Sequence, residues 1–298
     1  MRKALSILIP TYNYNVLPLV KQLHDQGLAS AITFEIKVYD DCSPNPPKEN
    51  EDINLLSHSS YTKLPKNIGR SAIRNKLARE ATNETLLFLD ADTKVIRDNF
   101  LTTYIAAINN STEIIYGGIT YQENPPNTDE KLRWVYGMKR EALAVSERQK
   151  QPHLRFLTLN FLINKSVFKK IKFNEDIPNL RHEDTLFALD SKENNIHVAH
   201  IDNPVVHLGL ESSQVFLRKS IEAVDALLHM VDEGLIAPKD TALSEKGEAW
   251  SGKFMGWCSG VFYKMFKKSM EKNLLSNSPS MGLFDMYRLG YYLQQKNR

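Results

Sequence analysis

One stretch in the first third of the chain constrains the fold most. Four apolar residues, 86–89, are followed at once by Asp90-Ala91-Asp92. The apolar run is too short for a buried helix and too uninterrupted for a half-exposed strand, so it predicts a strand buried on both faces. Ligands of a parallel α/β sheet bind beyond the carboxyl ends of the strands. The two carboxylates are therefore expected at a ligand-binding edge of the sheet.

Two interpretations of Asp90 and Asp92 remain open at this point. No lysine or arginine separates them, so together they can hold a hard divalent cation that keeps open coordination positions for a ligand such as a phosphate. Aspartate also favours turns and helix starts, and a plain turn after a strand would use the same residues. This stretch alone does not decide between a metal site and a turn.

The composition describes a globular protein. The chain has 298 residues, of which 42% are hydrophobic and 24% charged, which fits one large domain or a domain with an appendage. No apolar run reaches the length of a transmembrane helix, and the amino terminus enters a strand-like segment and not a signal-peptide core. Cys42 and Cys258 form no metal or redox motif. We expect a cytoplasmic protein, with the inner face of the membrane as an alternative location, and a net charge of +3 gives no reason to expect nucleic acid as a partner.

Strand and helix units alternate before the acidic stretch. Apolar patterns predict strands at 4–9, 34–39 and 60–64 and helices at 16–28 and from Asn67, which is the predicted cap of its helix. The first two strands end in polar loops, Pro10-Thr11-Tyr12-Asn13 and Asp40-Asp41. These units predict an open, mostly parallel sheet. The glycine signatures of dinucleotide-binding and P-loop folds are absent from the sequence, which argues against both.

The helix that follows the third strand offers a second candidate contact for a ligand. Gly69 and Arg70 lie at its start, where free backbone N–H groups and a guanidinium can face a phosphate or a nucleotide. A surface arginine on an ordinary amphipathic helix remains an alternative.

Four motifs together make the chain resemble the family 2 glycosyltransferases, which have the GT-A fold. They are Ile9-Pro10-Thr11-Tyr12-Asn13, Asp40-Asp41-Cys42-Ser43, Asn67-Ile68-Gly69-Arg70 with Arg74-Asn75, and Leu89-Asp90-Ala91-Asp92. The resemblance covers roughly residues 4–211 and implies a bacterial source and a GT-A, Rossmann-like catalytic domain over 1–211. Helical spacing of apolar residues from Gln214 onward predicts a helical extension over 212–298.

The resemblance implies where a nucleotide sugar would bind. Asp92 would bind the Mn²⁺ or Mg²⁺ that bridges the donor phosphates, and Asp90 would face the ribose or the same metal. The segment 116–120 resembles the strand and loop in which glycines let the backbone approach the donor sugar. The full set of implied contacts to the nucleotide sugar is Pro10, Thr11, Tyr12, Asn13, Asp40, Asn67, Gly69, Arg70, Asp90, Ala91, Asp92, Gly118 and Glu183.

Two further residues are implied by the resemblance in the second half. Glu183 and Asp184 resemble a Glu-Asp motif whose aspartate is the general base, and an acidic first turn of a helix is the alternative. His207 follows a strand-like run at a position where some members carry a further metal ligand. Imidazole suits Mn²⁺ better than Mg²⁺, and a purely structural histidine is the alternative.

The function implied is inverting, metal-dependent transfer of a sugar from a nucleotide-diphosphate sugar, with UDP favoured. The acceptor would be a hydroxyl of a glycan or of a lipid-linked molecule in cell-surface polysaccharide synthesis. A non-catalytic sugar- or partner-binding protein on a transferase scaffold is one alternative, and the intact Asp92 and Asp184 argue against it. A nucleotidyltransferase is another, but residues 10–15 lack the glycine- and arginine-rich loop expected of that class.

Two segments are expected to serve the acceptor. A predicted helix at 129–149 would shape the acceptor pocket. Residues 254–270 form a basic amphipathic helix with Trp257, Val261, Phe262, Met265 and Phe266 on one side, so contact with a membrane surface is possible in principle. Packing of these side chains against the catalytic domain is the commoner use of such a stripe.

Overall fold

The computed structural model describes residues 4–30, 32–109, 111–123, 127–177 and 181–296. Within them the chain forms two compact units. Unit 1 takes the described residues of Met1–Tyr121, Glu141–Asn179 and Glu183–Gly209, and unit 2 takes those of Gln122–Arg140, Leu180–His182 and Leu210–Arg298. The contacts assign 122–123 and 127–140 to unit 2, whereas the sequence places them in a catalytic domain over 1–211. The predicted boundary between this catalytic domain and a helical extension over 212–298 stays a prediction.

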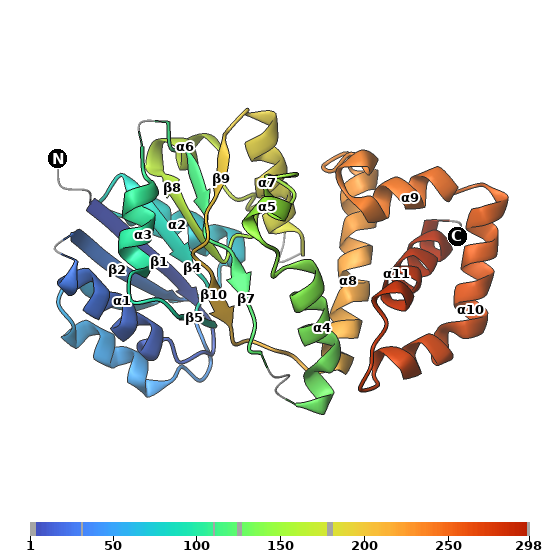
Figure 1. The fold of residues 1–298 in the computed structure, drawn as a ribbon, viewed down its shortest axis with the longest axis horizontal. Coiled ribbons are helices and arrows are strands. Elements are labelled where there is room, and N and C mark those ends of the chain that lie inside the picture. Colours follow the sequence, from blue (N-terminus) through green and yellow to red (C-terminus); the bar gives the residue numbers. More distant parts are fainter. Residues whose placement is uncertain (1–3, 31, 110, 124–126, 178–180, 297–298) are drawn as a thin grey trace. The chain divides into compact units, whose positions relative to one another are not determined.

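Unit 1 is built on a seven-stranded sheet in the order β3-β2-β1-β4-β8-β6-β9 (Figure 1). The strands β1, β2, β3 and β4 pair in parallel, and β8 runs antiparallel between β4 and β6. The mixed, mostly parallel α/β fold predicted from the sequence is confirmed. The strands are β1 Ala4–Thr11, β2 Thr33–Asp40, β3 Ser59–Lys63, β4 Thr85–Leu89, β6 Ile114–Tyr116, β8 Asn160–Asn164 and β9 Val198–His200.

The apolar run before the acidic pair is the centre of this sheet. Residues 86–89 of β4 are fully buried between β1 and β8, as their uninterrupted apolar character requires. The first strand extends two residues beyond the predicted end, because Pro10 and Thr11 remain in parallel register with Tyr39 and Asp40 of β2. Consequently β1, β2 and β4 all end at one edge of the sheet, where β1 ends in Thr11, β2 ends in Asp40 and Asp90 follows the end of β4.

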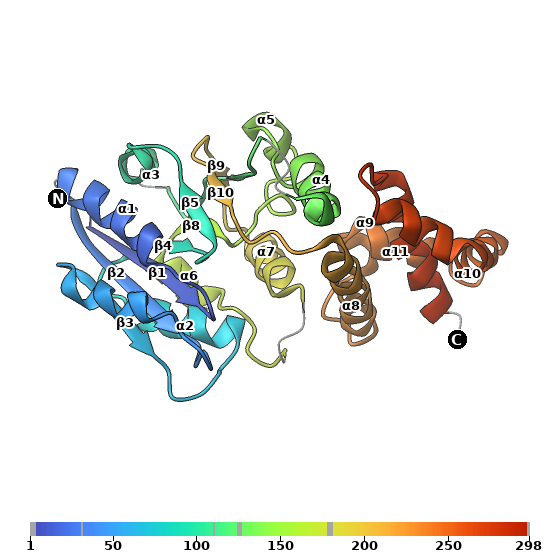
Figure 2. The same cartoon turned by 90° about the horizontal axis from the view of Figure 1, so that it is seen from below.

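Helices cover both faces of the sheet. Figure 2 shows α1 (Leu17–Ala29) and α3 (Phe100–Ala107) on one face and α2 (Arg70–Glu80) on the other. Phenylalanines from several elements form a stacked core, in which Phe88 lies 5.0 Å from Phe161 and Phe173 lies 4.3 Å from Phe187 between ring centroids. Further helices of unit 1 are η1 Lys48–Leu55, α5 Val145–Arg148, α6 Lys165–Lys170 and α7 Glu183–Glu193.

A three-stranded sheet lies next to the carboxyl end of β4. Its order is β5-β10-β7, with β5 Thr93–Val95, β10 Val205–His207 and β7 Ile119–Thr120. The strand β5 begins directly after Asp92, and its antiparallel register with β10 pairs Thr93 with His207. This pairing brings a histidine from the second half of the unit to the acidic motif.

Unit 2 is helical, as predicted for the carboxy-terminal region. Its core joins apolar side chains of several helices, among them Leu132, Leu217, Tyr263 and Phe284. No helix in the described part of the chain combines the length and apolarity needed to span a bilayer. The helices are η2 Thr128–Glu130, α4 Lys131–Arg140, α8 Ser213–Asp232, η3 Pro238–Asp240, α9 Ala242–Trp250, α10 Phe254–Leu274 and α11 Met281–Lys296.

The single helix predicted at 129–149 is wrong. The chain leaves the helix after Arg140 and begins another turn only at Val145. Glu141 accepts a hydrogen bond from the hydroxyl of Tyr121, and the N–H of Leu143 bonds to the carbonyl of Glu141 in a tight turn. These contacts end the helix although the sequence pattern favours its continuation, because tertiary contacts commonly override local helix propensity.

The aromatic stripe of α10 is not part of the core of unit 2. Trp257, Met265 and the other side chains of the stripe are exposed, and their predicted packing against the catalytic domain stays a prediction. The helix instead packs through Tyr263, Met270 and Leu274. Gly290 of α11 makes this possible, since a Cβ at that position would lie 2.6 Å from the Cβ of Tyr263.

Candidate active site

The acidic motif at the end of β4 forms a tight turn between the two sheets. The N–H of Asp90 donates to the carbonyl of Leu159 over 2.9 Å, and the carbonyl of Asp90 accepts from the N–H and hydroxyl of Thr93. Ala91 is buried between the two aspartates. The turn therefore fixes the directions in which Asp90 and Asp92 leave the sheet.

Arg74 of α2 ties Asp90 to the first turn of α7. Its Nη2 lies 2.7 Å from Asp90 Oδ1, and its Nη1 lies 3.9 Å from Glu183 Oε1. Arg70, one helical turn earlier, points its Nη1 at the same Glu183 oxygen from 3.6 Å. Only 8% of the Arg74 side chain is exposed. Three elements, β4, α2 and α7, are thus joined by one buried guanidinium.

The electrostatics of this group follow from burial and charge. Burial raises the pKa of Asp90 and the neighbouring Asp92 adds to the effect, while Arg74 opposes it. Burial likewise raises the pKa of Glu183, with Asp184 adding to it and Arg74 opposing. Burial works against the charge of Arg74, but Asp90 and Glu183 outweigh it and raise the pKa of the guanidinium. Arg74 is therefore a permanent cation among carboxylates.

Asp184 lies in the same group, at the start of α7. Its Oδ1 accepts a hydrogen bond of 2.8 Å from the N–H of Thr185, and its charge acts on both Glu183 and Arg74. The side chain is half-buried. A carboxylate at this position, beside Arg74 and Glu183, can in chemical terms accept a proton from a bound hydroxyl.

Asp92 faces His207 across the small sheet. Asp92 Oδ2 lies 3.4 Å from His207 Nε2, as the pairing of β5 with β10 requires. The other ring nitrogen of His207, Nδ1, is buried and has no hydrogen-bond partner among the described residues. A buried polar atom without a partner needs an explanation other than packing.

The pair Asp92 and His207 fits a divalent metal in its donor chemistry. Mn²⁺ accepts both carboxylate oxygen and imidazole nitrogen. Two donors that each lie about 2.1 Å from one octahedral ion are about 3 Å apart, close to the 3.4 Å separation seen. No cluster of three or more histidine, cysteine, aspartate or glutamate side chains suited to a metal occurs in the described ranges. Such a two-residue site leaves the remaining positions for oxygens of a ligand.

Gly209 closes the chain over Asp92. The N–H of Leu208 donates to the carbonyl of Asp92 over 2.8 Å, and a Cβ built at 209 would lie only 2.0 Å from Asp92 Oδ2. Any side chain at this position would therefore displace the carboxylate. The phenol of Tyr14 is also nearby, since burial and then the charge of Asp92 raise its pKa.

The loop after β2 organises the start of α2. Asp40 is buried, and its carboxylate accepts from the N–H of Ser43 and from the hydroxyl of Tyr61, each over 2.7 Å. Asp41 accepts from the N–H groups of Ile68 and Gly69 over 2.7 and 2.9 Å. The predicted capping of α2 by Asn67 is wrong, because the residue that flanks the helix is Gly69 and no side-chain cap is present among the described residues. Asp41 instead fixes the two residues that lead into the helix.

The contacts of Asp41 also bear on the predicted anion site at the start of α2, because they use the N–H groups of Ile68 and Gly69. The helix has no side-chain cap at Gly69, its first flanking residue, and Asn67 uses its amide to donate to the carbonyl of Asp41. The N–H of Gly69 already donates to Asp41 and is not free for a phosphate. Arg70, whose side chain is mostly exposed, can still meet an anion at this helix start.

The remaining predicted residues lie around this centre in unit 1. Thr11 is buried at the end of β1, Tyr12 is exposed, and the N–H of Asn13 donates to the hydroxyl of Ser43 over 2.7 Å. Pro10 pairs with β2. Gly118 has a φ of 105°, and its carbonyl accepts from the side-chain amide of Asn160.

Some of the predicted site residues are thus in direct contact with one another, and others lie in neighbouring loops. Arg70, Asp90 and Glu183 meet around Arg74, with Asp184 alongside, and Asp92 meets His207. The segment from Pro10 to Asn13 joins the Asp40 loop through Ser43. Gly118 contacts Asn160 through its carbonyl, and a Cβ at this position would lie 2.9 Å from Arg148 Nη2.

Four residues that position this site were not among the predicted site residues: Tyr14, Arg74, Asp41 and Gly209. Arg74 could have been found, since it follows Arg70 by four residues and therefore lies on the same helix face. Gly209 follows His207 by two residues, but only the fold shows that its missing side chain makes room for Asp92.

Comparison with known proteins points to one family. Residues 6–172 match the family model described as glycosyl transferase family 2. Among curated proteins, none matches the chain.

Several solved structures share the fold at low sequence identity. A mannosyltransferase from Pyrobaculum calidifontis, in complex with GDP-Man and Mn²⁺, has a TM-score of 0.57 at 14% identity over 98% of this chain and 85% of its own. Glucosyl-3-phosphoglycerate synthase from Mycobacterium tuberculosis, with Mn²⁺, UDP and its product, has a TM-score of 0.52 at 13% identity over 76% of this chain and 79% of its own. TarS 1-349 of S. aureus has a TM-score of 0.50 at 15% identity over 98% of this chain and 90% of its own.

Proposed function

Because the chain belongs to glycosyl transferase family 2, whose model matches more than half of it, we propose that this glycosyltransferase moves a sugar from a UDP-sugar to an acceptor hydroxyl with inversion. The observation that carries the proposal is the group at the end of β4, where Arg74 binds Asp90 and Glu183 while Asp92 faces His207. Carboxylates are gathered there beside arginines, where a diphosphate and an acceptor can meet.

Asp92 and His207 would hold Mn²⁺ or Mg²⁺, and a bound ion offsets the negative charge of a diphosphate leaving group. Arg70 supports the same end of the reaction, because its exposed guanidinium lies at the rim of the site and attracts the diphosphate. Arg74 orients Asp90 and Glu183 and does not itself need to touch the donor.

Asp184 is the proposed general base. It accepts the proton of the acceptor hydroxyl as the hydroxyl oxygen attacks the anomeric carbon, and the bond from that carbon to the diphosphate breaks on the opposite face. One displacement inverts the anomeric configuration. No enzyme nucleophile is required, which agrees with the use of a single carboxylate as base.

UDP is the proposed nucleotide, and Asp40, the segment 10–13, Asn67 and Gly69 would form the walls of its site with Gly118 near the sugar. Solved structures with this fold contain UDP in one case and GDP-Man in another, each with Mn²⁺. We place the enzyme in the cytoplasm, where it glycosylates a glycan or lipid-linked acceptor of cell-surface polysaccharide synthesis.

Calorimetry of UDP binding tests this proposal. UDP is expected to bind with Mn²⁺ present and to lose most of its affinity in EDTA, because a carboxylate and a diphosphate repel each other without a cation between them. Asp92→Ala should remove the metal-dependent part of the affinity. Asp52→Ala, at an exposed position of η1 in the same unit, is the matched control and should bind as the parent does. Equal affinity with and without EDTA would contradict the role of Asp92.

A further inference from the structure

Helix α10 of unit 2 has two apolar faces, and only one of them is packed. Tyr263, Met270 and Leu274 are buried in the core of the unit. Seven other large apolar side chains of the helix are exposed: Phe254, Met255, Trp257, Val261, Phe262, Met265 and Phe266. Phe254, Trp257 and Met265 expose 77, 63 and 71% of their surface. A contiguous apolar surface of this kind marks an interaction site on a soluble protein.

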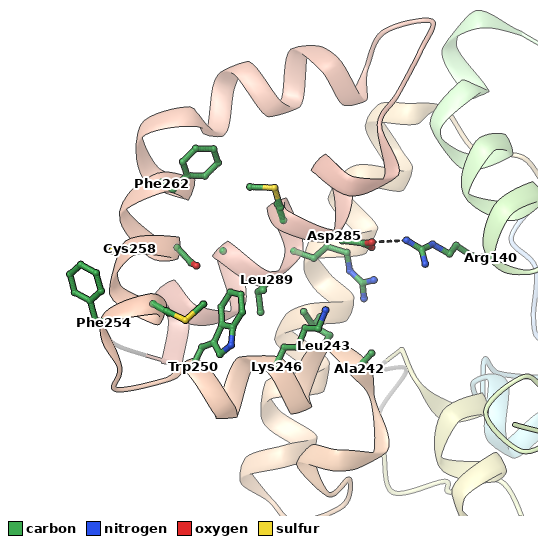
Figure 3. Close-up of a pocket in the computed structure, with 15 residues that line it drawn as sticks. Arg140, Ala242, Leu243, Lys246, Trp250, Phe254, Cys258, Phe262, Asp285 and Leu289 are labelled. Carbon is green, nitrogen blue, oxygen red and sulfur yellow. Dashed lines mark hydrogen bonds and ion pairs between the residues drawn. The ribbon is translucent and has the colours of Figure 1, made fainter.

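A cavity of about 920 Å³ adjoins this face (Figure 3). It lies among α9, α10 and α11, with Trp250 and Phe262 pointing into it and Phe254 on the outer side of α10. The volume is that of a pocket for a large apolar ligand. Three of its four charged lining residues are basic: Arg140 pairs with Asp285 over 2.5 Å, and Lys246 and Arg288 line the same cavity.

Arg288 supplies a second sign that the cavity takes a ligand. Its Nε is buried and has no hydrogen-bond partner in the part of the chain that the structure describes. The guanidinium packs over the ring of Phe284, with its Cζ 5.5 Å from the ring centroid. An apolar cavity with cations along its lining matches an amphiphile that has an apolar chain and an anionic head.

The charge of α10 distinguishes among possible occupants. Residues 253–272 contain five lysines and one glutamate, a net charge of +4. Lys264, Lys267 and Lys268 are exposed next to the apolar side chains. A second copy of the chain would bring two such positive faces together, which is unfavourable. Exposed aromatic side chains beside lysines on one helix are the pattern of helices that lie at the surface of anionic membranes.

We propose that α10 and the adjoining cavity form a docking surface for an anionic lipid bilayer. The exposed apolar side chains of the first three turns enter the boundary between headgroups and chains, and Trp257 lies at the headgroup level. Lys264, Lys267 and Lys268 face the anionic headgroups. The cavity takes the apolar chain of one lipid. This docking does not depend on which sugar the enzyme transfers.

Co-sedimentation with vesicles tests the electrostatic part. The protein should bind vesicles of equal parts phosphatidylglycerol and phosphatidylcholine and bind phosphatidylcholine alone far more weakly. Each lysine near an anionic surface contributes about fivefold, so replacing Lys264, Lys267 and Lys268 by glutamate should weaken binding about a hundredfold or more. The matched control replaces three exposed lysines of unit 1, Lys169, Lys170 and Lys172, by glutamate and should bind nearly as the parent does. Equal loss in both variants, or no loss, would overturn the proposal.

The apolar part is tested by a triple variant, Phe254→Ser, Trp257→Ser and Met265→Ser. The three side chains are exposed, so the variant should keep its helical circular dichroism and lose vesicle binding. Unchanged vesicle binding would contradict the docking surface. Dimerisation of the parent that this variant abolishes, together with no vesicle binding by the parent, would instead make the face an interface between copies.

Tryptophan fluorescence tests the cavity. The chain has three tryptophans: Trp134 on α4, Trp250 in the cavity lining and Trp257 on the exposed face. In proteins that retain one tryptophan each, with phenylalanine at the other two positions, lipids with brominated chains should quench Trp250 and Trp257 and leave Trp134 unchanged. Quenching of Trp257 alone would overturn the role of the cavity, and quenching of neither would overturn the docking surface.

Discussion

At the scale of single residues, the candidate site depends on Arg74. Its buried guanidinium contacts both Asp90 and Glu183, and the pKa of both carboxyls is raised by burial against its opposing charge. Removing it leaves Asp90 without this cation and Glu183 with Arg70 at 3.6 Å, and breaking a pair that holds a buried charge costs about 3 kcal/mol or more.

We therefore expect Arg74→Met to lower the free energy of unfolding by about 3 kcal/mol in urea titrations. Arg79 on the same helix has a side chain that is 66% exposed and lies 4.0 Å from Glu80. Arg79→Met, the matched control, should change the free energy by less than about 1 kcal/mol. Equal destabilisation of the two variants would show that the contacts of Arg74 with Asp90 and Glu183 stabilise the fold no more than an exposed arginine does.

Gly209 gives a second test at this scale. Gly209→Ala would place a methyl group 2.0 Å from Asp92 Oδ2, so the carboxylate must move. We expect the affinity for UDP in Mn²⁺ to fall by about 10- to 100-fold, as for other changes that misplace a metal ligand. Gly260→Ala on α10 meets no atom within 4 Å and serves as the control in the same calorimetric titration. Unchanged affinity in Gly209→Ala would argue that Asp92 holds no metal.

Helices and strands were predictable from the sequence to different degrees. The strand β4 was predicted to within one residue, because 86–89 are apolar without interruption and Asp90 ends the run. The break between α4 and α5 was not, because it depends on the contact of Glu141 with Tyr121, twenty residues earlier. The buried face of α10 could not be predicted from the sequence either, because apolar residues occur on both sides of this helix. The packing of Tyr263 against Gly290 is visible in the fold alone.

The candidate site was predictable where one motif holds the relevant residues. Asp90 and Asp92 are recognisable because they directly follow a predicted strand. The contact that fixes the start of α2 was not predicted, because Asp41 lies 28 positions from Gly69 in the chain. The contact of Asp92 with His207 also needs the pairing of β5 with β10, which no local pattern specifies.

The contacts that fix the start of α2 give a prediction at the scale of the element. Asp41→Ala should destabilise the protein by about 1–2 kcal/mol, since it leaves the N–H groups of Ile68 and Gly69, just before the helix, without their acceptor. Asn67→Ala, at the exposed position that the sequence suggested as the cap, should cost less, because only one hydrogen bond to the Asp41 carbonyl is lost. Chemical denaturation measures both. A larger cost at Asn67 would show that Asn67, and not Asp41, fixes the start of the helix.

At the scale of the whole molecule, stability should depend on the protonation of His200. Its Nε2 bonds to the carbonyl of Pro152 and its Nδ1 lies 3.3 Å from Arg148 Nη1. Burial and the charge of Arg148 lower the pKa of His200 from 6.5 to about 4. In the unfolded chain His200 therefore binds a proton below about pH 6.5, whereas in the folded protein it binds one only below about pH 4. Folding becomes less favourable as the pH falls through this window, because the unfolded state binds more protons there.

The cost reaches about 3 kcal/mol at the acid end of the window. His200→Gln should remove this component, so the difference in unfolding free energy between parent and variant should change between pH 6.5 and pH 4. Exposed His229 of α8 gives the control, His229→Gln, whose difference from the parent should stay nearly constant. A constant difference for His200→Gln as well would show that His200 does not couple folding to pH.

We propose that this enzyme transfers a sugar with inversion, with Asp184 as base. The most direct test follows UDP release and the anomeric configuration of the product by NMR, with a panel of UDP-sugars and with Asp184→Asn beside the parent. We expect an inverted product from the parent and a rate in Asp184→Asn that is lower by about two orders of magnitude or more, with UDP affinity nearly unchanged. Asp190→Asn, later on the same helix and also half-buried, should transfer normally. A product with retained configuration, or near-normal turnover in Asp184→Asn, would rule out inversion with Asp184 as the base.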